Sequence, residues 1–308
     1  MKKHCTKVVK LCRQNRYIFA KVVVLIYNFF MKEFLPKCDL HLHSNISDGD
    51  FSVEYVLDRQ KALGIDVVAL TDHDTVDGVA HAKEYGKKIG LQVLAGVELS
   101  TMGDKEVHIL GYNVDYRNKG FVKELKRLRD LREIRNQKMI DKLNKLGIKI
   151  TMDEVKVFAT GTTTGRSHIA KVLVQKGYAL SVNHAFEEYL AFGKKAYVKE
   201  ERITPEEGVK LIKRFGGKAV LAHPYSLDLT FDEADVFVGQ LVKAGLAGIE
   251  SDYFSHTNED KEKYGRLADK YGLFKTGGSD FHREPIEDNR PKYTTLSPAG
   301  YRELKIEV

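Results

Sequence analysis

Short β-rich runs alternate with segments of helical periodicity throughout the chain beyond residue 37. This alternation predicts an α/β fold built on a mainly parallel sheet. Helices are expected between the strands, for example over residues 53–63, 77–89, 205–215 and 257–271, because each segment is bounded by a capping residue, a proline or a glycine. Seven βα units predict an incomplete barrel, with strands over residues 38–43, 66–71, 92–98, 106–111, 218–223, 247–252 and 273–278.

The alternation is interrupted once, between Asp115 and Tyr197, where helical stretches follow one another without a convincing strand. The first of them, over residues 121–146, is amphipathic, with an apolar face and many Lys and Arg side chains on the other faces. We interpret this region as a mainly helical insertion into the barrel.

The positive net charge of the chain is concentrated in two segments. The 308 residues carry a net charge of +7, but residues 1–37 alone carry nine Lys or Arg and one Glu. Residues 117–149 hold twelve Lys or Arg against four Asp or Glu. The remaining body is therefore acidic, and the high isoelectric point does not by itself indicate a nucleic-acid-binding protein.

The three cysteines, Cys5, Cys12 and Cys38, lie in the first 38 residues, which excludes a disulfide framework in the rest of the chain. A cytoplasmic enzyme is therefore expected. The apolar segment 17–30 is short for a membrane span and contains Lys21, so we expect no stable membrane insertion. A membrane anchor is the alternative to the interpretation we favour, in which translation starts at Met31 and residues 1–30 have no role in the fold.

Nine His, Asp and Glu residues fall at the ends of predicted strands or just beyond them. In a parallel barrel these ends meet at one rim, where active sites are built. Two pairs, His41 with His43 and Asp280 with His282, have the i, i+2 spacing that directs both side chains to one face of a strand. The full set is His41, His43, Asp48, His73, Glu98, His108, His223, Asp280 and His282.

These nine residues are difficult to explain as ordinary core residues. A single histidine at a strand end is usually structural, but unpaired Asp and Glu are almost never buried. A cluster of nitrogen and oxygen ligands without sulfur predicts several divalent cations such as Zn²⁺, Mn²⁺ or Fe²⁺, rather than a thiolate zinc or copper site. Cys38 is expected to point to the opposite face and to belong to the core.

The motifs that carry these residues resemble those of the PHP (polymerase and histidinol phosphatase) superfamily. They are DLHLHSNISDGD (39–50), LTDHDT (70–75), GVELS (96–100), HILGY (108–112), AHP (222–224) and GSDFH (278–282). The resemblance implies a distorted seven-stranded (β/α)7 PHP barrel with up to three metal ions. One metal would be bound by His41, His43, Glu98 and Asp280, a second by Glu98, His108 and His223, and a third by Asp48, His73 and His282.

The insertion is similar to that of bacterial PHP proteins that hydrolyse nucleoside 3′,5′-bisphosphates and 5′-nucleotides and trim short RNA from its 5′ end. In that subgroup the insertion caps the site and supplies phosphate-binding arginines, and Arg135 and Arg166 occupy the matching positions. Arg135 could equally be a helix-surface residue paired with Glu. Arg166 follows the Gly-rich stretch GTTTG at a helix start, which suits an anion. His168 and Lys195 are weaker candidates.

The resemblance implies a metal-dependent phosphoesterase that acts on nucleotides and on short RNA, with no DNA specificity. Glu98, Asp280, Arg166 and His168 are the expected catalytic residues, and Arg135, Arg166 and Lys195 the expected substrate-binding residues. The leaving group would be protonated by a water held by the metals, by Asp74 or by His168. A histidinol phosphate phosphatase and a non-catalytic accessory PHP module are the alternatives.

Four parts of the chain are expected from these observations. Residues 1–37 form a basic extension outside the fold, 38–115 the first part of the barrel, 116–197 the insertion that caps the site, and 198–308 the second part of the barrel. One departure from the family pattern follows the GSDFH motif, where REPIEDNRP replaces the expected Gly-rich continuation.

Overall fold

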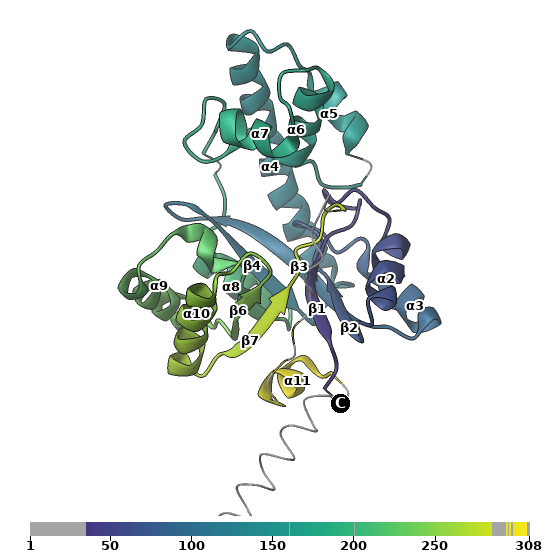
Figure 1. Ribbon diagram of the computed structural model, residues 1–308, viewed down its shortest axis with the longest axis vertical. Coiled ribbons are helices and arrows are strands. Elements are labelled where there is room, and N and C mark those ends of the chain that lie inside the picture. The colour runs from purple at the N-terminus through teal and green to yellow at the C-terminus, as the bar shows by residue number, and fades with distance from the viewer. Residues whose placement is uncertain are drawn as a thin grey trace, which may run out of the picture. The chain divides into compact units, whose positions relative to one another are not determined.

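Seven strands lie in chain order in one sheet in the computed structural model (Figure 1). The structure describes residues 35–159, 161–199 and 201–284, together with Thr294, Leu296 and residues 298–306. The strands are β1 (Cys38–Leu42), β2 (Val67–Leu70), β3 (Gln92–Met102), β4 (Glu106–Tyr112), β5 (Lys218–Leu221), β6 (Gly248–Tyr253) and β7 (Phe274–Gly278). The predicted number of strands and the α/β class are confirmed.

The sheet is mainly parallel, as predicted, but β4 runs antiparallel to both of its neighbours. The prediction of seven βα units was therefore wrong at one position, because no helix separates β3 from β4. Only three residues, 103–105, connect these strands. A parallel crossover needs about a dozen residues or more, so this connection can only form a hairpin.

The sheet curves until its first and last strands meet. Leu42 forms a parallel bridge with Phe281, and the amide of His43 donates to the Phe281 carbonyl at 3.0 Å. Gly278 permits this approach, because a Cβ atom at this position would lie 2.4 Å from the Cβ of His41. The result is a nearly closed barrel.

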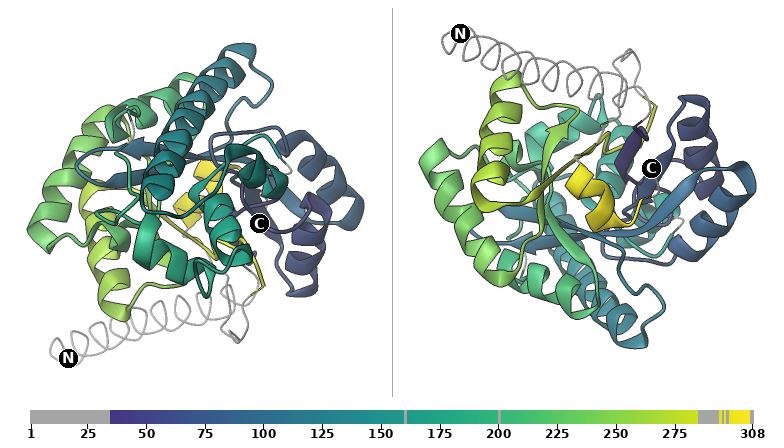
Figure 2. Two further views of the ribbon diagram at one scale, coloured as in Figure 1. Left: turned by 90° about the horizontal axis from the view of Figure 1, so that it is seen from above. Right: turned by 90° about the horizontal axis from the view of Figure 1, so that it is seen from below.

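Helices cover the outside of the barrel. Outward-facing strand residues and helices α8 (Pro205–Arg214), α9 (Phe231–Ala244) and α10 (Asn258–Tyr271) form one hydrophobic cluster. A second cluster joins β1–β3 to α2 (Val53–Ala62) and α3 (Val79–Ile89). Figure 2 shows α11 (Pro298–Leu304) across the end of the barrel opposite the insertion. Burial of these apolar faces positions the strand ends that carry the site.

The insertion contains α4 (Lys119–Lys145), α5 (Met152–Phe158), α6 (Arg166–Gln175), α7 (Val182–Ala185) and a π-helical turn, η1 (Phe186–Leu190). Phe121 and Leu125 of α4 pack in the barrel cluster, whereas Met139 and Leu143 belong to a separate core within the insertion. The helix therefore connects two hydrophobic cores. Figure 1 shows α4 rising from the barrel to the other helices of the insertion.

Three expectations fall partly or wholly outside the described residues. They concern the extension 1–37, the apolar segment 17–30 and the loop after the GSDFH motif. Within the part of the chain that is described, no helix is both long and apolar enough to cross a membrane.

Candidate metal centre

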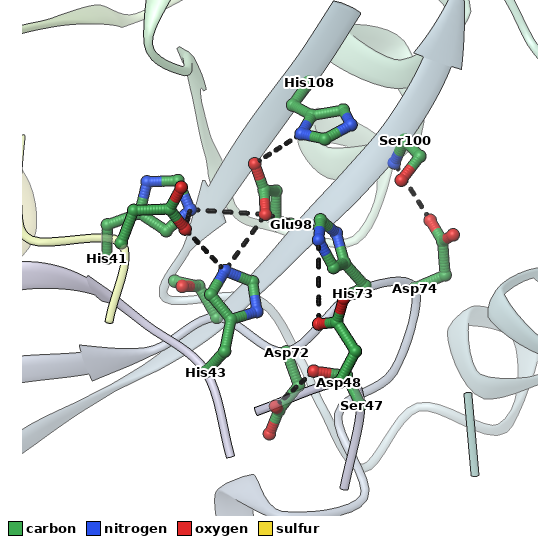
Figure 3. Close-up of polar contacts among 12 residues, drawn as sticks. His41, His43, Ser47, Asp48, Asp72, His73, Asp74, Glu98, Ser100 and His108 are labelled. Carbon is green, nitrogen blue, oxygen red and sulfur yellow. Dashed lines mark hydrogen bonds and ion pairs between the residues drawn. The ribbon is translucent and has the colours of Figure 1, made fainter. Parts of the chain in front are cut away.

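All nine predicted ligand residues come together at one rim of the barrel. Figure 3 shows six of them, His41, His43, Asp48, His73, Glu98 and His108. Six of the strands bring their carboxyl ends to this rim. The antiparallel strand β4 contributes a residue near its beginning instead, and His108 pairs with Ser100 of β3. Because β4 runs in the opposite direction, its first residues lie at this rim, and His108 is among them.

Glu98 occupies the centre of the cluster. Its Oε2 atom lies 3.2 Å from His41 Nε2, 3.1 Å from His43 Nε2 and 3.1 Å from His73 Nδ1. Its Oε1 atom lies 2.8 Å from His108 Nδ1 and 3.0 Å from His223 Nε2. The two carboxylate oxygens therefore face two different sets of imidazoles, which is the geometry that a bridging carboxylate requires.

Two aspartates complete the cluster on either side of His43. Asp280 Oδ1 lies 3.3 Å from His41 Nε2 and 3.2 Å from His43 Nε2. Asp48 Oδ1 lies 3.2 Å from His282 Nε2. Asp280 thus faces the same two ring nitrogens as Glu98, whereas Asp48 faces His282.

Several of these atoms are buried without a hydrogen bond, although acceptors and ring nitrogens lie near them. Two ligands bound about 2.1 Å from one ion are themselves roughly 3.0–3.4 Å apart, which is the spacing seen around Glu98 and Asp280. A cation between these atoms would satisfy them together. Among the nine ligand residues, the buried side-chain atoms without a hydrogen-bond partner are His41 Nε2, His43 Nδ1 and Nε2, Asp48 Oδ1, His73 Nδ1, Glu98 Oε2 and Asp280 Oδ1.

Contacts other than those among the ligand atoms orient three of the histidines. The Nδ1 atom of His41 lies 3.1 Å from Glu250 Oε1, and the Nδ1 atom of His282 lies 2.9 Å from the Asp280 carbonyl. Glu106 approaches His108 Nε2 at 3.4 Å. With a proton on the nitrogen that faces each acceptor, the other nitrogen keeps a lone pair for a metal. Glu250 was not predicted, although an acidic residue inside the buried strand β6 was a signal for it.

The structure groups the ligands into three sets. Each residue in a set offers one atom, and these atoms lie within 4.8 Å of one another. Buried groups of this composition suit divalent metals. The sets are His41, His43, Glu98 and Asp280; His43, Asp48, His73 and His282; and His73, Glu98 and His108. The first of these sets is the one expected for the first metal. The second adds His43 to the three residues expected for the third metal. The last contains Glu98 and His108, which were expected together with His223, but has His73 as its third member, and His223 also lies near Glu98 and His108.

The carboxylates and imidazoles shift one another's pKa values. Burial alone would lower the pKa of His43, but the Asp280 and Glu98 carboxylates raise it to about 10. Burial likewise opposes protonation of His108, whose pKa Glu98 and Glu106 raise to about 9. The cluster therefore attracts positive charge strongly enough to retain protons at neutral pH when no metal competes.

A cavity of about 500 Å³ opens beside the ligands. Arg132 and Arg166 both line it, together with Phe186 and Phe254. Arg166, a predicted substrate-binding residue, also donates to Glu106 through Nη2. Arg132 was not predicted, yet its Nη2 atom lies 2.6 Å from Asp74 Oδ2 and 2.6 Å from Ser100 Oγ.

The other predicted residues of the insertion do not line this cavity. Arg135 is buried and lines a separate small cavity of about 70 Å³. Lys195 is exposed and pairs with Glu188 at 2.9 Å. His168 is buried, and its Nδ1 atom accepts from the Gly165 amide at 3.0 Å.

The two side chains considered as acids are held in unsuitable protonation states. Burial alone would raise the pKa of Asp74, but Arg132 and Arg202 lower it, which keeps this carboxyl ionised. Burial lowers the pKa of His168 to about 4, so its imidazole is neutral near pH 7. Asp74 is therefore better suited to anchoring Arg132 than to donating a proton. His168 is likewise better suited to capping α6 than to donating a proton.

The PHP domain model matches residues 39–201 of the chain. The chain belongs to the PHP domain family. A 5′-3′ exoribonuclease of Haemophilus influenzae is 35% identical over 247 residues, which cover 80% of this chain and 90% of the relative. A 3′,5′-nucleoside bisphosphate phosphatase of Chromobacterium violaceum is 35% identical over 250 residues, which cover 80% of this chain and 88% of the relative.

Solved structures support the same relationship. A Chromobacterium violaceum structure described as an amidohydrolase, with bound sulfate and no metal, has a TM-score of 0.80 and 33% identity and covers 87% of this PHP chain and 95% of its own. A Bifidobacterium adolescentis structure described as a metal-dependent phosphoesterase has a TM-score of 0.76 and 28% identity, with coverages of 87% and 94%. The PHP barrel expected from the motifs is thereby confirmed.

Proposed function

We propose that this PHP protein is a metal-dependent phosphoesterase that removes phosphate from nucleoside 3′,5′-bisphosphates and 5′-nucleotides and acts on the 5′ ends of short RNA. The observation that carries this proposal is the position of Glu98, whose two oxygens face two sets of histidines beside an arginine-lined cavity. The relatives named above, a bisphosphate phosphatase and a 5′-3′ exoribonuclease, support the substrate class.

The nine ligand residues would hold up to three divalent ions, with Mn²⁺, Zn²⁺ and Fe²⁺ as the candidates. Such ions supply a water that is nucleophilic near neutral pH and neutralise charge on the phosphoryl oxygens. Glu98 and Asp280 would contribute to the reaction by holding these ions. Glu250 supports them by orienting His41, which it contacts at 3.1 Å.

Residues of the insertion and the barrel would bind the rest of the substrate. Arg166 lies at the start of α6 and reaches the cavity, where its guanidinium can bind a phosphate. Arg132 adds a second guanidinium whose orientation is set by Asp74 and Ser100. Phe186 and Phe254 provide apolar surface in the same cavity for a sugar or base.

The proposal is tested by measuring phosphate release from adenosine 3′,5′-bisphosphate, AMP and histidinol phosphate in parallel. The protein is first freed of metal with a chelator and then reloaded separately with Mn²⁺, Zn²⁺ or Fe²⁺. We expect the bisphosphate to be the best substrate, AMP the next and histidinol phosphate the poorest. A preference for histidinol phosphate would support the alternative phosphatase, and absence of turnover with every metal and substrate would support an accessory module.

A further inference from the structure

A second groove leads away from the metal centre. Its volume is about 370 Å³, and it shares Glu106, His108, Arg166 and Phe186 with the cavity at the metals. The two hollows are therefore continuous at Arg166. The groove continues between Lys105 on the barrel rim and Phe192 in the insertion, and we call it the Phe192 groove.

The insertion side of the Phe192 groove carries two aromatic rings. Phe192 is 56% exposed, and its ring packs at 60° against Tyr197 with 5.2 Å between the centroids. Phe186 lies at the junction of the two hollows, where the Arg166 guanidinium carbon is 5.7 Å from its ring centroid. A single exposed aromatic residue is ordinary on a protein surface. Here the exposed ring faces a groove that begins at the catalytic centre.

The groove also carries positive charge between its aromatic side and the metals. Arg166 donates to Glu106 through Nη2, which leaves further N–H groups of the guanidinium for an anion. Lys105 is exposed on the barrel side, where its ammonium group donates to the Leu227 carbonyl at 2.7 Å. Cations followed by aromatic rings form the combination that binds the backbone and bases of single-stranded nucleic acids.

We propose that the Phe192 groove binds the second nucleotide of an oligonucleotide whose 5′-terminal nucleotide lies at the metals. The second base would stack on Phe192, and the linking phosphate would lie beside Arg166 at the junction of the two hollows, with Lys105 on the groove side. Water would add to the phosphorus of this linkage and its bond to the 3′ oxygen of the first nucleotide would break, so that one dinucleotide and one water give two AMP. The two volumes, about 500 Å³ and about 370 Å³, each fall in the range of sites for small ligands, so that each hollow accepts one nucleotide. This inference rests on the proposed function and assigns the part of the site that would hold the second nucleotide of a chain.

The test compares AMP with 5′-phosphorylated diadenylate as substrates of the metal-loaded, full-length protein. Stacking of one base on an aromatic ring is lost in Phe192→Ala, so kcat/KM for the dinucleotide should fall on the order of 10-fold. The value for AMP should change less than about twofold, because AMP does not extend into the groove. Phe192→Tyr keeps the ring and should restore the dinucleotide value.

Leu180→Ala is the matched control, because Leu180 is 89% exposed in the same insertion but does not line the groove. It should leave both substrates unchanged. Equal losses on both substrates in Phe192→Ala, or an unchanged preference for the dinucleotide, would overturn the inference while leaving the phosphatase activity established. Hydrolysis of AMP without any hydrolysis of the dinucleotide would also overturn it. If neither these substrates nor the bisphosphate were hydrolysed, the proposed function itself would fail.

Discussion

Glu98 on β3 and His108 on β4 face each other across an antiparallel strand pair, with 2.8 Å between Glu98 Oε1 and His108 Nδ1. The other oxygen of Glu98 faces His41, His43 and His73. Glu98 therefore lies between the imidazoles of His41, His43 and His73 on one side and those of His108 and His223 on the other. The hairpin between β3 and β4 makes this connection possible.

This relationship predicts the effect of Glu98→Gln. The amide retains the shape of the side chain but loses the negative charge that faces both sets of imidazoles, so metal should bind more weakly to both sets. We expect the purified variant to lose metal and its kcat/KM to fall by at least about 100-fold. Metal content by elemental analysis and turnover are measured on the same preparation.

Glu187→Gln serves as the control for this substitution, because Glu187 is exposed and lies outside the ligand cluster. It should retain normal metal content and turnover. A Glu98→Gln protein with full metal content and full activity would contradict the bridging role of Glu98. It would also remove the main support for a shared metal centre.

The strands and the ligand residues were predictable because they depend on local patterns. Alternating β-rich and helical segments identified seven strands, and i, i+2 spacing placed His41 and His43 on one face. The direction of β4 was missed because this strand is largely buried and lacks the full alternation that marks many antiparallel strands. The short connection over residues 103–105 was the available signal, since it leaves no room for a crossover helix.

The arginines of α4 were harder to assign. Arg132 and Arg135 lie three residues apart on the same helix, so they are neighbours on one face, separated by about 60° around the axis. Arg132 reaches the cavity at the metals, whereas Arg135 lines a different one. The choice between them depends on how α4 is rotated against the barrel, and that rotation is set by tertiary packing at Phe121 and Leu125 rather than by the local sequence.

Metal binding should release protons from the cluster. The pKa of His43 is raised to about 10 and that of His108 to about 9, so near pH 7 in the metal-free protein both imidazoles are positively charged, with a proton on each ring nitrogen. A metal must displace these protons, and its apparent affinity should therefore rise as the pH increases from about 7 toward 9. Calorimetric titration with Zn²⁺ in two buffers of different ionisation enthalpy measures the number of protons released.

The control for this experiment is His81→Gln, since His81 is exposed and pairs with Glu54 outside the cluster. The proton count for this variant should equal that of the unchanged protein. Identical binding heats in the two buffers, or an affinity that falls as the pH rises, would show that the histidines are already neutral before metal arrives.

The closure of the barrel at Gly278 predicts a large effect of Gly278→Ala. The new Cβ atom would lie 2.4 Å from His41 Cβ and 2.7 Å from the His41 amide nitrogen. The strands must separate to accommodate it, at a cost of roughly 1–3 kcal/mol in the free energy of unfolding. Because His41 itself moves, metal affinity should fall together with stability. Urea unfolding and metal titration measure the two effects.

Gly265→Ala is the matched substitution, because its Cβ atom would meet only Lys275 side-chain atoms at 3.7 Å or more. Gly265 lies within α10, where alanine favours the helix by up to about 1 kcal/mol. We expect unchanged or increased stability and normal metal binding. Equal destabilisation by both substitutions would show that the contact between β7 and β1 is not the cause.

The position of Arg132 and Arg135 predicts different effects on substrate choice. Arg132→Ala removes a guanidinium from the wall of the metal cavity, and charge-assisted hydrogen bonds of this kind contribute about 1.5–3 kcal/mol. The preference for adenosine 3′,5′-bisphosphate over AMP should therefore fall by roughly 10-fold or more, and Arg166→Ala should act in the same direction. Arg135→Ala should leave the preference unchanged, because this side chain lines a separate cavity.

The free energy of unfolding of Arg132→Ala has to be measured together with its substrate preference. Arg132 also neutralises Asp74, which has no exposed surface. Loss of a buried partner destabilises a protein by about 3–5 kcal/mol, although Arg202 at 3.5 Å from Asp74 compensates part of it. Arg132→Lys retains the charge without the two-pronged geometry, so it should recover most of the stability but little of the preference. If Arg135→Ala reduced the preference and Arg132→Ala did not, the phosphate-binding arginine would be the one that the family resemblance indicated, and α4 would have to sit differently over the metals when substrate is bound.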